Sequence, residues 1–136
     1  MATFEQLDAL ARSLPEVEVK FSTDDRPEYR VRKKLFLCLR GRRKDAIDPA
    51  TGERMDDVLM IRTPGLEAKE QLLADVALPL FTTEHFFGWP AVLLRVRDLG
   101  EVSDEALHGL VTEAWKVQAP KGVVKAWLAA ATREVA

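Results

Sequence analysis

The chain has 136 residues and a net charge of −2, with 47% hydrophobic and 31% charged residues. This balance predicts one globular domain, residues 1–136, and excludes a disordered chain. No stretch approaches the ~20 consecutive apolar residues that span a membrane, and a single cysteine, Cys38, excludes an internal disulfide and a cysteine-based zinc site. The first residues lack the basic start and apolar run of a secretory signal, so we expect a cytoplasmic protein.

The predicted elements are short strands between helices. Thr3 and Gln6 have the spacing of a capping box and open an amphipathic helix over residues 4–14. Apolar alternation or short apolar runs predict strands at 17–21, 29–31, 35–39, 58–61, 80–81 and 91–96. A helix near 64–75 is predicted with Thr63 as its N-cap, another begins after Ser103, and the last follows Pro120. This order predicts an α+β fold, an antiparallel sheet covered on one face by helices.

Positive charge is concentrated in one part of the chain. Residues 26–44 contain nine Lys or Arg and one acid, a net charge of +8, whereas the remainder carries −10. A tight hairpin turn is expected at residues 32–34, and a long polar loop at 41–57. The cations before and after the intervening strand are expected to form one rim that binds phosphates. These predicted contacts are Arg30, Arg32, Lys33, Lys34, Arg40, Arg42, Arg43 and Lys44.

An alternative interpretation makes this segment a solvated sheet edge whose cations prevent further strand pairing. The following loop also contains acids that could neutralise the cations, namely Asp45, Asp48, Glu53, Asp56 and Asp57. If about five cations met phosphates, binding would weaken with log salt at a slope near −4 to −5.

Four segments resemble one known family, in the same order along the chain. Residues 80–93 (LFTTEHFFGWPAVL) are similar to the family's run from "FFTT-x-H" to "PAVL", and residues 114–121 resemble its "AW…APK". Residues 14–18 and 29–36 are similar to its "LPEVEE" and "FRV-x-GKLF". The chain thus resembles the MmcQ/YjbR-like family, which implies a frataxin-like (CyaY-like) fold and DNA binding through a "double wing" of hairpins. Lys33 stands where that family commonly has glycine.

A second hypothesis places a small-molecule or protein-interaction pocket around Thr82, His85 and Trp89, with Lys121 as a further member. For His85 itself we favour a structural role, in which the imidazole holds a strand turn by hydrogen bonds. The three tryptophans are interpreted as core and rim packing rather than as base-stacking platforms.

No catalytic constellation presents itself, neither a Ser/His/Asp set, nor a phosphate-cradling glycine loop, nor a carboxylate pair. The sequence therefore predicts a non-enzymatic binding protein without a metal or cofactor, with DNA as the expected partner.

Overall fold

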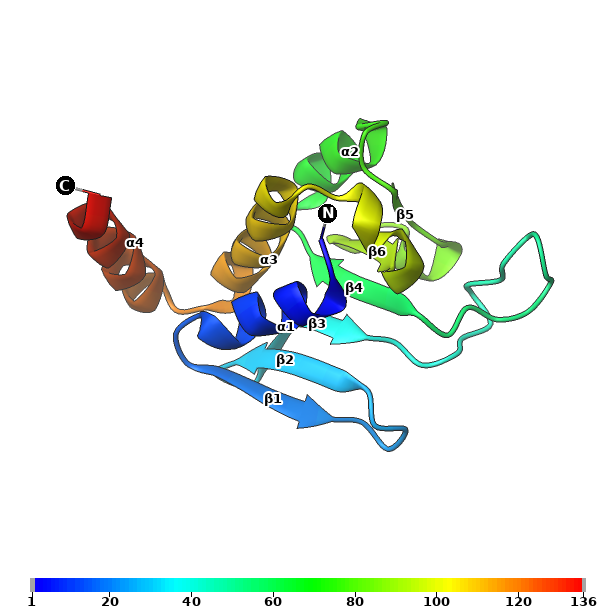
Figure 1. Ribbon diagram of the computed structural model, residues 1–136, viewed down its shortest axis with the longest axis horizontal. Coiled ribbons are helices and arrows are strands. Elements are labelled where there is room, and N and C mark those ends of the chain that lie inside the picture. Colours follow the sequence, from blue (N-terminus) through cyan, green and yellow to red (C-terminus); the bar gives the residue numbers. More distant parts are fainter. Residues whose placement is uncertain (1, 136) are drawn as a thin grey trace.

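The computed structural model of the protein describes residues 2–135 (Figure 1). Six strands form one sheet in the order β1-β2-β3-β4-β6-β5, and every neighbouring pair is antiparallel. The strands are β1 (Val17–Phe21), β2 (Pro27–Val31), β3 (Lys34–Leu39), β4 (Val58–Arg62), β5 (Leu80–Phe81) and β6 (Ala91–Arg95). The helices are α1 (Phe4–Ser13), α2 (Leu66–Ala74), α3 (Asp104–Gln118) and α4 (Lys121–Val135), with 3-10 turns η1 (Glu84–Phe86) and η2 (Val96–Glu101). The predicted α+β fold is confirmed, and the frataxin-like arrangement stays a prediction.

Local capping residues fix the beginnings of two helices as predicted. Before α1, Gln6 donates its backbone N–H to Thr3 Oγ1 at 3.2 Å and accepts the Thr3 N–H on its side chain at 2.8 Å. Before α3, Ser103 Oγ accepts the N–H of Ala106 at 3.1 Å. These bonds satisfy N–H groups that have no partner within the helix.

The prediction for α2 is wrong at its first turn. The helix begins at Leu66 after Gly65, which makes no side-chain cap, rather than after Thr63. Thr63 instead donates its N–H to Pro90 O at 2.8 Å, so it extends the contact between β4 and β6, and its hydroxyl binds Gly65 O. Because the Thr63 hydroxyl donates to Gly65 O, it does not cap an N–H of the helix.

Different parts of the chain bury the two faces of the sheet. Helices α1 and α3 cover one face and enclose the larger core, which includes the fully buried Tyr29, Ile61 and Trp115. On the other face, a smaller cluster from β4 and β6 is covered by Ala46 of the long loop and by Phe86 of η1. Within residues 2–135, no helix covers this second face across β1 to β3. Among residues 2–135, no helix combines the length and the apolar character needed to cross a bilayer.

The turn between β2 and β3 is a two-residue hairpin without glycine. Arg32 and Lys33 adopt positive φ angles of 49° and 69°, which matches the turn type whose twist suits a two-residue hairpin. Residues other than glycine adopt positive φ angles at an energetic cost, so contacts of the turn's side chains are expected to help stabilise it. Arg32 binds Glu16 through two hydrogen bonds of 2.7 and 3.3 Å.

Candidate nucleic-acid interface

The eight predicted basic residues lie at two opposite ends of the sheet. Residues 30–34 surround the β2–β3 turn, whereas residues 40–44 follow β3 at the end where the β1–β2 turn also lies. The six residues of β3 span about 20 Å at the usual rise per residue. In Figure 1 the turn at residues 32–33 is on the side of α4, and the long loop extends away on the other side. The structure therefore does not bring the eight cations into one rim.

At the β2–β3 turn, two cations have acidic partners and two do not. Arg32 binds Glu16 as described above, and Arg30 contacts Glu28 at 3.2 Å. Lys33 and Lys34 are exposed, and neither side chain has a hydrogen-bond or ion-pair partner among the described residues. Lys33 and Lys34 are thus the cations available for phosphates at this end.

At the other end, Arg40 is part of the protein interior. Its side chain is 8% exposed, its two terminal nitrogens contact Asp45 at 3.1 and 2.7 Å, and it lies 4.7 Å from the centre of the Phe86 ring. Asp45 also accepts a 2.6 Å hydrogen bond from Thr83 Oγ1. Arg40 therefore joins the start of the loop to η1 and is not placed to contact a phosphate.

The Arg40–Asp45 pair predicts a pH-dependent contribution to stability. Hydrogen bonds from Arg40, with a smaller contribution from Thr83, lower the pKa of Asp45 from 3.8 to about 2. A lowered folded-state pKa stabilises the protein above the unfolded pKa, and this stabilisation is lost as the pH falls from about 4 towards 2. We expect Asp45→Asn to lower the free energy of unfolding by about 1–2 kcal/mol at pH 7, and by less near pH 2.

Urea unfolding of the wild-type protein and of Asp45→Asn between pH 7 and pH 2 measures this contribution. The difference between their free energies of unfolding at each pH removes the effect of other carboxyl groups. A difference that stays constant across this range would contradict the assignment.

The next three cations are at the surface. Arg42 is 63% exposed and contacts Asp56 at 3.5 Å, a distance at which an exposed pair contributes little. Arg43 and Lys44 are exposed, and within residues 2–135 no acidic side chain pairs with either. Both line a hollow of about 620 Å³ on the helix-free face, whose apolar floor includes Leu35, Cys38, Met60 and Phe86. Burial raises the pKa of the Cys38 thiol to about 11, so the thiol is protonated at neutral pH.

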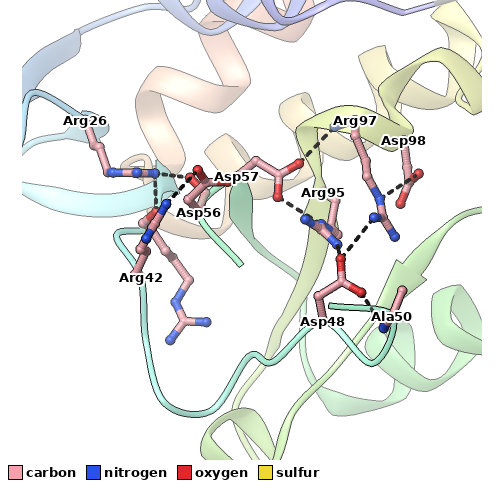
Figure 2. A network of polar contacts seen from close by, with 10 residues as sticks. Arg26, Arg42, Asp48, Ala50, Asp56, Asp57, Arg95, Arg97 and Asp98 are labelled. Atoms are coloured by element: carbon pink, nitrogen blue, oxygen red, sulfur yellow. Dashed lines mark hydrogen bonds and ion pairs between the residues drawn. The ribbon is translucent and has the colours of Figure 1, made fainter. Parts of the chain in front are cut away.

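Two acids of the long loop, Asp48 and Asp57, bind arginines outside the basic segment (Figure 2), whereas Asp45 and Asp56 bind Arg40 and Arg42 within it. Asp48 accepts hydrogen bonds from Arg95 at 2.8 Å and from Arg97 at 3.2 Å. Asp57 accepts from Arg95 Nε at 2.8 Å and from the Arg97 N–H at 3.1 Å. The Arg95 hydrogen bond is the main reason that the pKa of Asp48 is lowered. These acids therefore hold the loop to β6 and η2 and do not neutralise Arg43 or Lys44.

The β1–β2 turn is tied to the same loop. Arg26 donates to the carbonyl oxygen of Arg40 at 2.7 Å and to that of Asp56, and contacts Asp24 at 3.0 Å. Further along, the bridge between Ile47 and Arg54 makes residues 46–55 a hairpin-like excursion. Two turns of the chain thus meet at the end of the sheet that presents Arg43 and Lys44.

The residues of the predicted ligand pocket are only partly together. His85 and Trp89 line one hollow of about 400 Å³, Thr82 lines an adjacent one with Lys69 and Phe87, and Lys121 lines neither. Lys121 is the first residue of α4, which Figure 1 shows on the opposite side of the molecule from the loop at 40–57.

The prediction that hydrogen bonds of His85 hold a turn is wrong. The imidazole is exposed and makes no hydrogen bond within the described part of the chain, and it contacts the edge of the Phe86 ring at 5.1 Å between centroids. Backbone bonds hold this turn instead, from Phe86 N to Thr83 O at 2.8 Å and from Phe87 N to Glu84 O at 3.2 Å.

Two functional candidates, Lys69 and Arg62, are not apparent from the sequence. Lys69 is buried in α2 and donates two hydrogen bonds to carbonyls of the turn after η1. It stands three and four residues before Leu72 and Leu73, so helical spacing places it on their inward stripe. Arg62 ends β4, and its guanidinium lies 5.0 Å from the centre of the exposed Trp89 ring. Nothing in the local pattern indicates that contact.

Comparison with known proteins agrees with the resemblance noted in the sequence. Uncharacterised proteins of Mycobacterium bovis and Mycobacterium tuberculosis are each 37% identical to this chain over 134 residues, covering 95% of this chain and 98% of theirs. The family model described as YjbR matches residues 12–117. This range begins in the last turn of α1, includes the whole sheet and ends one residue before the end of α3. The chain therefore belongs to the YjbR family.

Proposed function

We propose that this protein is a non-enzymatic nucleic-acid-binding protein that contacts phosphates through the end of the sheet where the long loop begins. The observation that carries the proposal is the pair of exposed cations Arg43 and Lys44, which have no acidic partner in the described chain. Arg42, weakly paired with Asp56, is a third cation at this end. An unpaired cation binds a phosphate without first breaking an ion pair, and releases counterions from the nucleic acid.

The hairpin-like excursion and the β1–β2 turn support this choice of site. The β1–β2 turn lines the hollow of Arg43 and Lys44 through Ser22 and Asp24, and the hairpin-like excursion begins directly after Asp45, which also lines it. These two turns would be the two wings that the family resemblance implies. Lys33 and Lys34 form a second, smaller basic site about 20 Å away. A nucleic acid lying along the helix-free face would reach both sites.

The test is a salt titration of binding to a labelled DNA duplex, measured by fluorescence anisotropy. Three phosphate contacts at the loop end predict a slope of log affinity against log salt near −3, and engagement of both ends predicts −4 to −5. We expect Arg43→Glu with Lys44→Glu to weaken binding about ten- to hundredfold and to reduce the slope by about 2.

The matched control reverses two exposed lysines of α4, Lys121→Glu with Lys125→Glu, which changes the net charge equally but lies away from the loop. An equal loss of affinity in both variants would reduce the effect to overall charge and contradict the site. Absence of binding by the wild-type protein at low salt would overturn the proposal.

A further inference from the structure

The segment that follows β5 exposes aromatic rings to an unusual degree. His85, Phe86, Phe87 and Trp89 line a hollow of about 400 Å³ that is formed by residues 85–89. Phe87 is 65% and Trp89 50% exposed, whereas Phe86 is buried beneath them. Large apolar side chains gathered at a surface mark a binding site more often than isolated ones do. Trp115 is buried in the core, whereas Trp89 is half exposed with the Arg62 guanidinium over its ring.

The exposed rings are held in place from below. The ammonium group of Lys69 donates to the carbonyl of Phe86 at 2.5 Å and to that of Trp89 at 2.7 Å. Trp89 N also binds Phe86 O at 3.0 Å, and Gly88 supplies the positive φ of 78° that the turn requires. A segment ordered in the free protein loses little conformational entropy when it binds a ligand.

Cations border the aromatic hollow on two sides. It adjoins the larger hollow that Arg43 and Lys44 line, because His85 and Phe86 line both. Asp24, Glu28 and Asp45 line the larger hollow too, and each is bonded to an arginine. Arg62 lies over the Trp89 ring, and its Nε is buried without a hydrogen-bond partner in the described structure. This combination favours a ligand that is flat, aromatic and anionic over an apolar segment of another protein.

We propose that residues 85–89 bind unpaired bases of a single-stranded nucleic acid, which stack on Trp89 and Phe87 while Arg43 and Lys44 contact the adjoining phosphates. The inference rests on the proposed function and specifies its substrate. In a duplex the bases stack on one another, so their faces are not accessible to protein rings. In a single strand each exposed base face can stack on an aromatic side chain with little sequence preference.

The experiment compares labelled (dT)15 with a duplex of the same length, by anisotropy, using the full chain. Wild-type protein is expected to bind the single strand more tightly. The variant Phe87→Ala with Trp89→Ala should bind the single strand about ten- to hundredfold more weakly, with duplex affinity and salt slope unchanged. The matched control is Leu128→Ala, which removes an apolar side chain that is 44% exposed on α4, away from the loop at 40–57.

A second measurement requires no variant. Of the three tryptophans, Trp89 is 50% exposed, Trp115 is buried and Trp127 is partly buried against Trp115. Stacking of thymine on Trp89 should therefore quench part of the protein fluorescence with the same midpoint as the anisotropy titration. Unchanged single-strand affinity in the Phe87/Trp89 variant, or equal wild-type affinity for both oligonucleotides, would overturn the inference and leave the rings to a protein partner. Absence of wild-type binding to either oligonucleotide at low salt would instead overturn the proposed function itself.

Discussion

Replacing Arg95 by alanine is expected to lower the free energy of unfolding by about 3–5 kcal/mol. The side chain is 11% exposed and is bonded to Asp48 and Asp57 at 2.8 Å each. Its removal leaves both carboxylates in a partly buried place without their main partner, so each retains its desolvation cost without the compensating charge. The same loss frees residues 46–55 from β6. Chemical denaturation measures the first effect, and amide hydrogen exchange within the loop measures the second.

Arg97→Ala is the control for this prediction. Arg97 contacts the same Asp48 at 3.2 Å, but its side chain is 56% exposed, and exposed ion pairs contribute about 1 kcal/mol or less. Equal losses in the two variants would show that burial of Arg95 does not determine the strength of the network. Increased hydrogen exchange confined to the loop, with unchanged global stability, would show that the loop opens as a separate unit.

Local sequence patterns predicted most of the elements because the contacts that fix them are local. The caps at Thr3 and Ser103 act on N–H groups three residues later, and apolar alternation or a short apolar run identified each strand. Thr63 shows where this reasoning ends. Its partner Pro90 directly precedes β6, and no local pattern indicates that a backbone N–H is already used in that way.

The predicted strand at residues 35–39 already implied that the two groups of cations lie at opposite ends of the sheet, and the prediction of a single rim did not take this into account. Residues 30–34 and 40–44 lie before and after the middle of β3. Because the strand is extended, these two groups of cations are far apart in space although they are close in the sequence. By contrast, the pairing of Asp48 with Arg95 joins residues 47 positions apart. Which loop acids neutralise the segment, and so which cations remain for phosphates, depends on tertiary contacts that composition and spacing do not contain.

Replacing Trp115 by alanine is expected to destabilise the protein by about 3–5 kcal/mol, as for other fully buried aromatic side chains. Trp115 of α3 is 0% exposed. Its Nε1 donates to the carbonyl oxygen of Pro15 at 3.1 Å, and its ring meets that of Trp127 edge to face at 5.2 Å. The substitution therefore creates a cavity beneath the sheet, leaves a carbonyl without its donor and removes the ring on which α4 packs. Chemical denaturation of the variant measures the total.

Trp115→Phe separates these contributions, because it keeps a ring and removes the N–H donor, for which we expect a loss of about 1–3 kcal/mol. A loss as large as that of the alanine variant would indicate that the hydrogen bond to Pro15, rather than the ring volume, holds α3 to the start of β1. The Trp115 variants also serve the binding experiments. Position 115 lies on the helix-covered side of the sheet, away from Arg43, Lys44 and Trp89, so nucleic-acid affinity per folded molecule should stay unchanged. An interface variant should show the reverse, with binding lost and stability kept, and this contrast distinguishes the residues that bind from those that only maintain the fold.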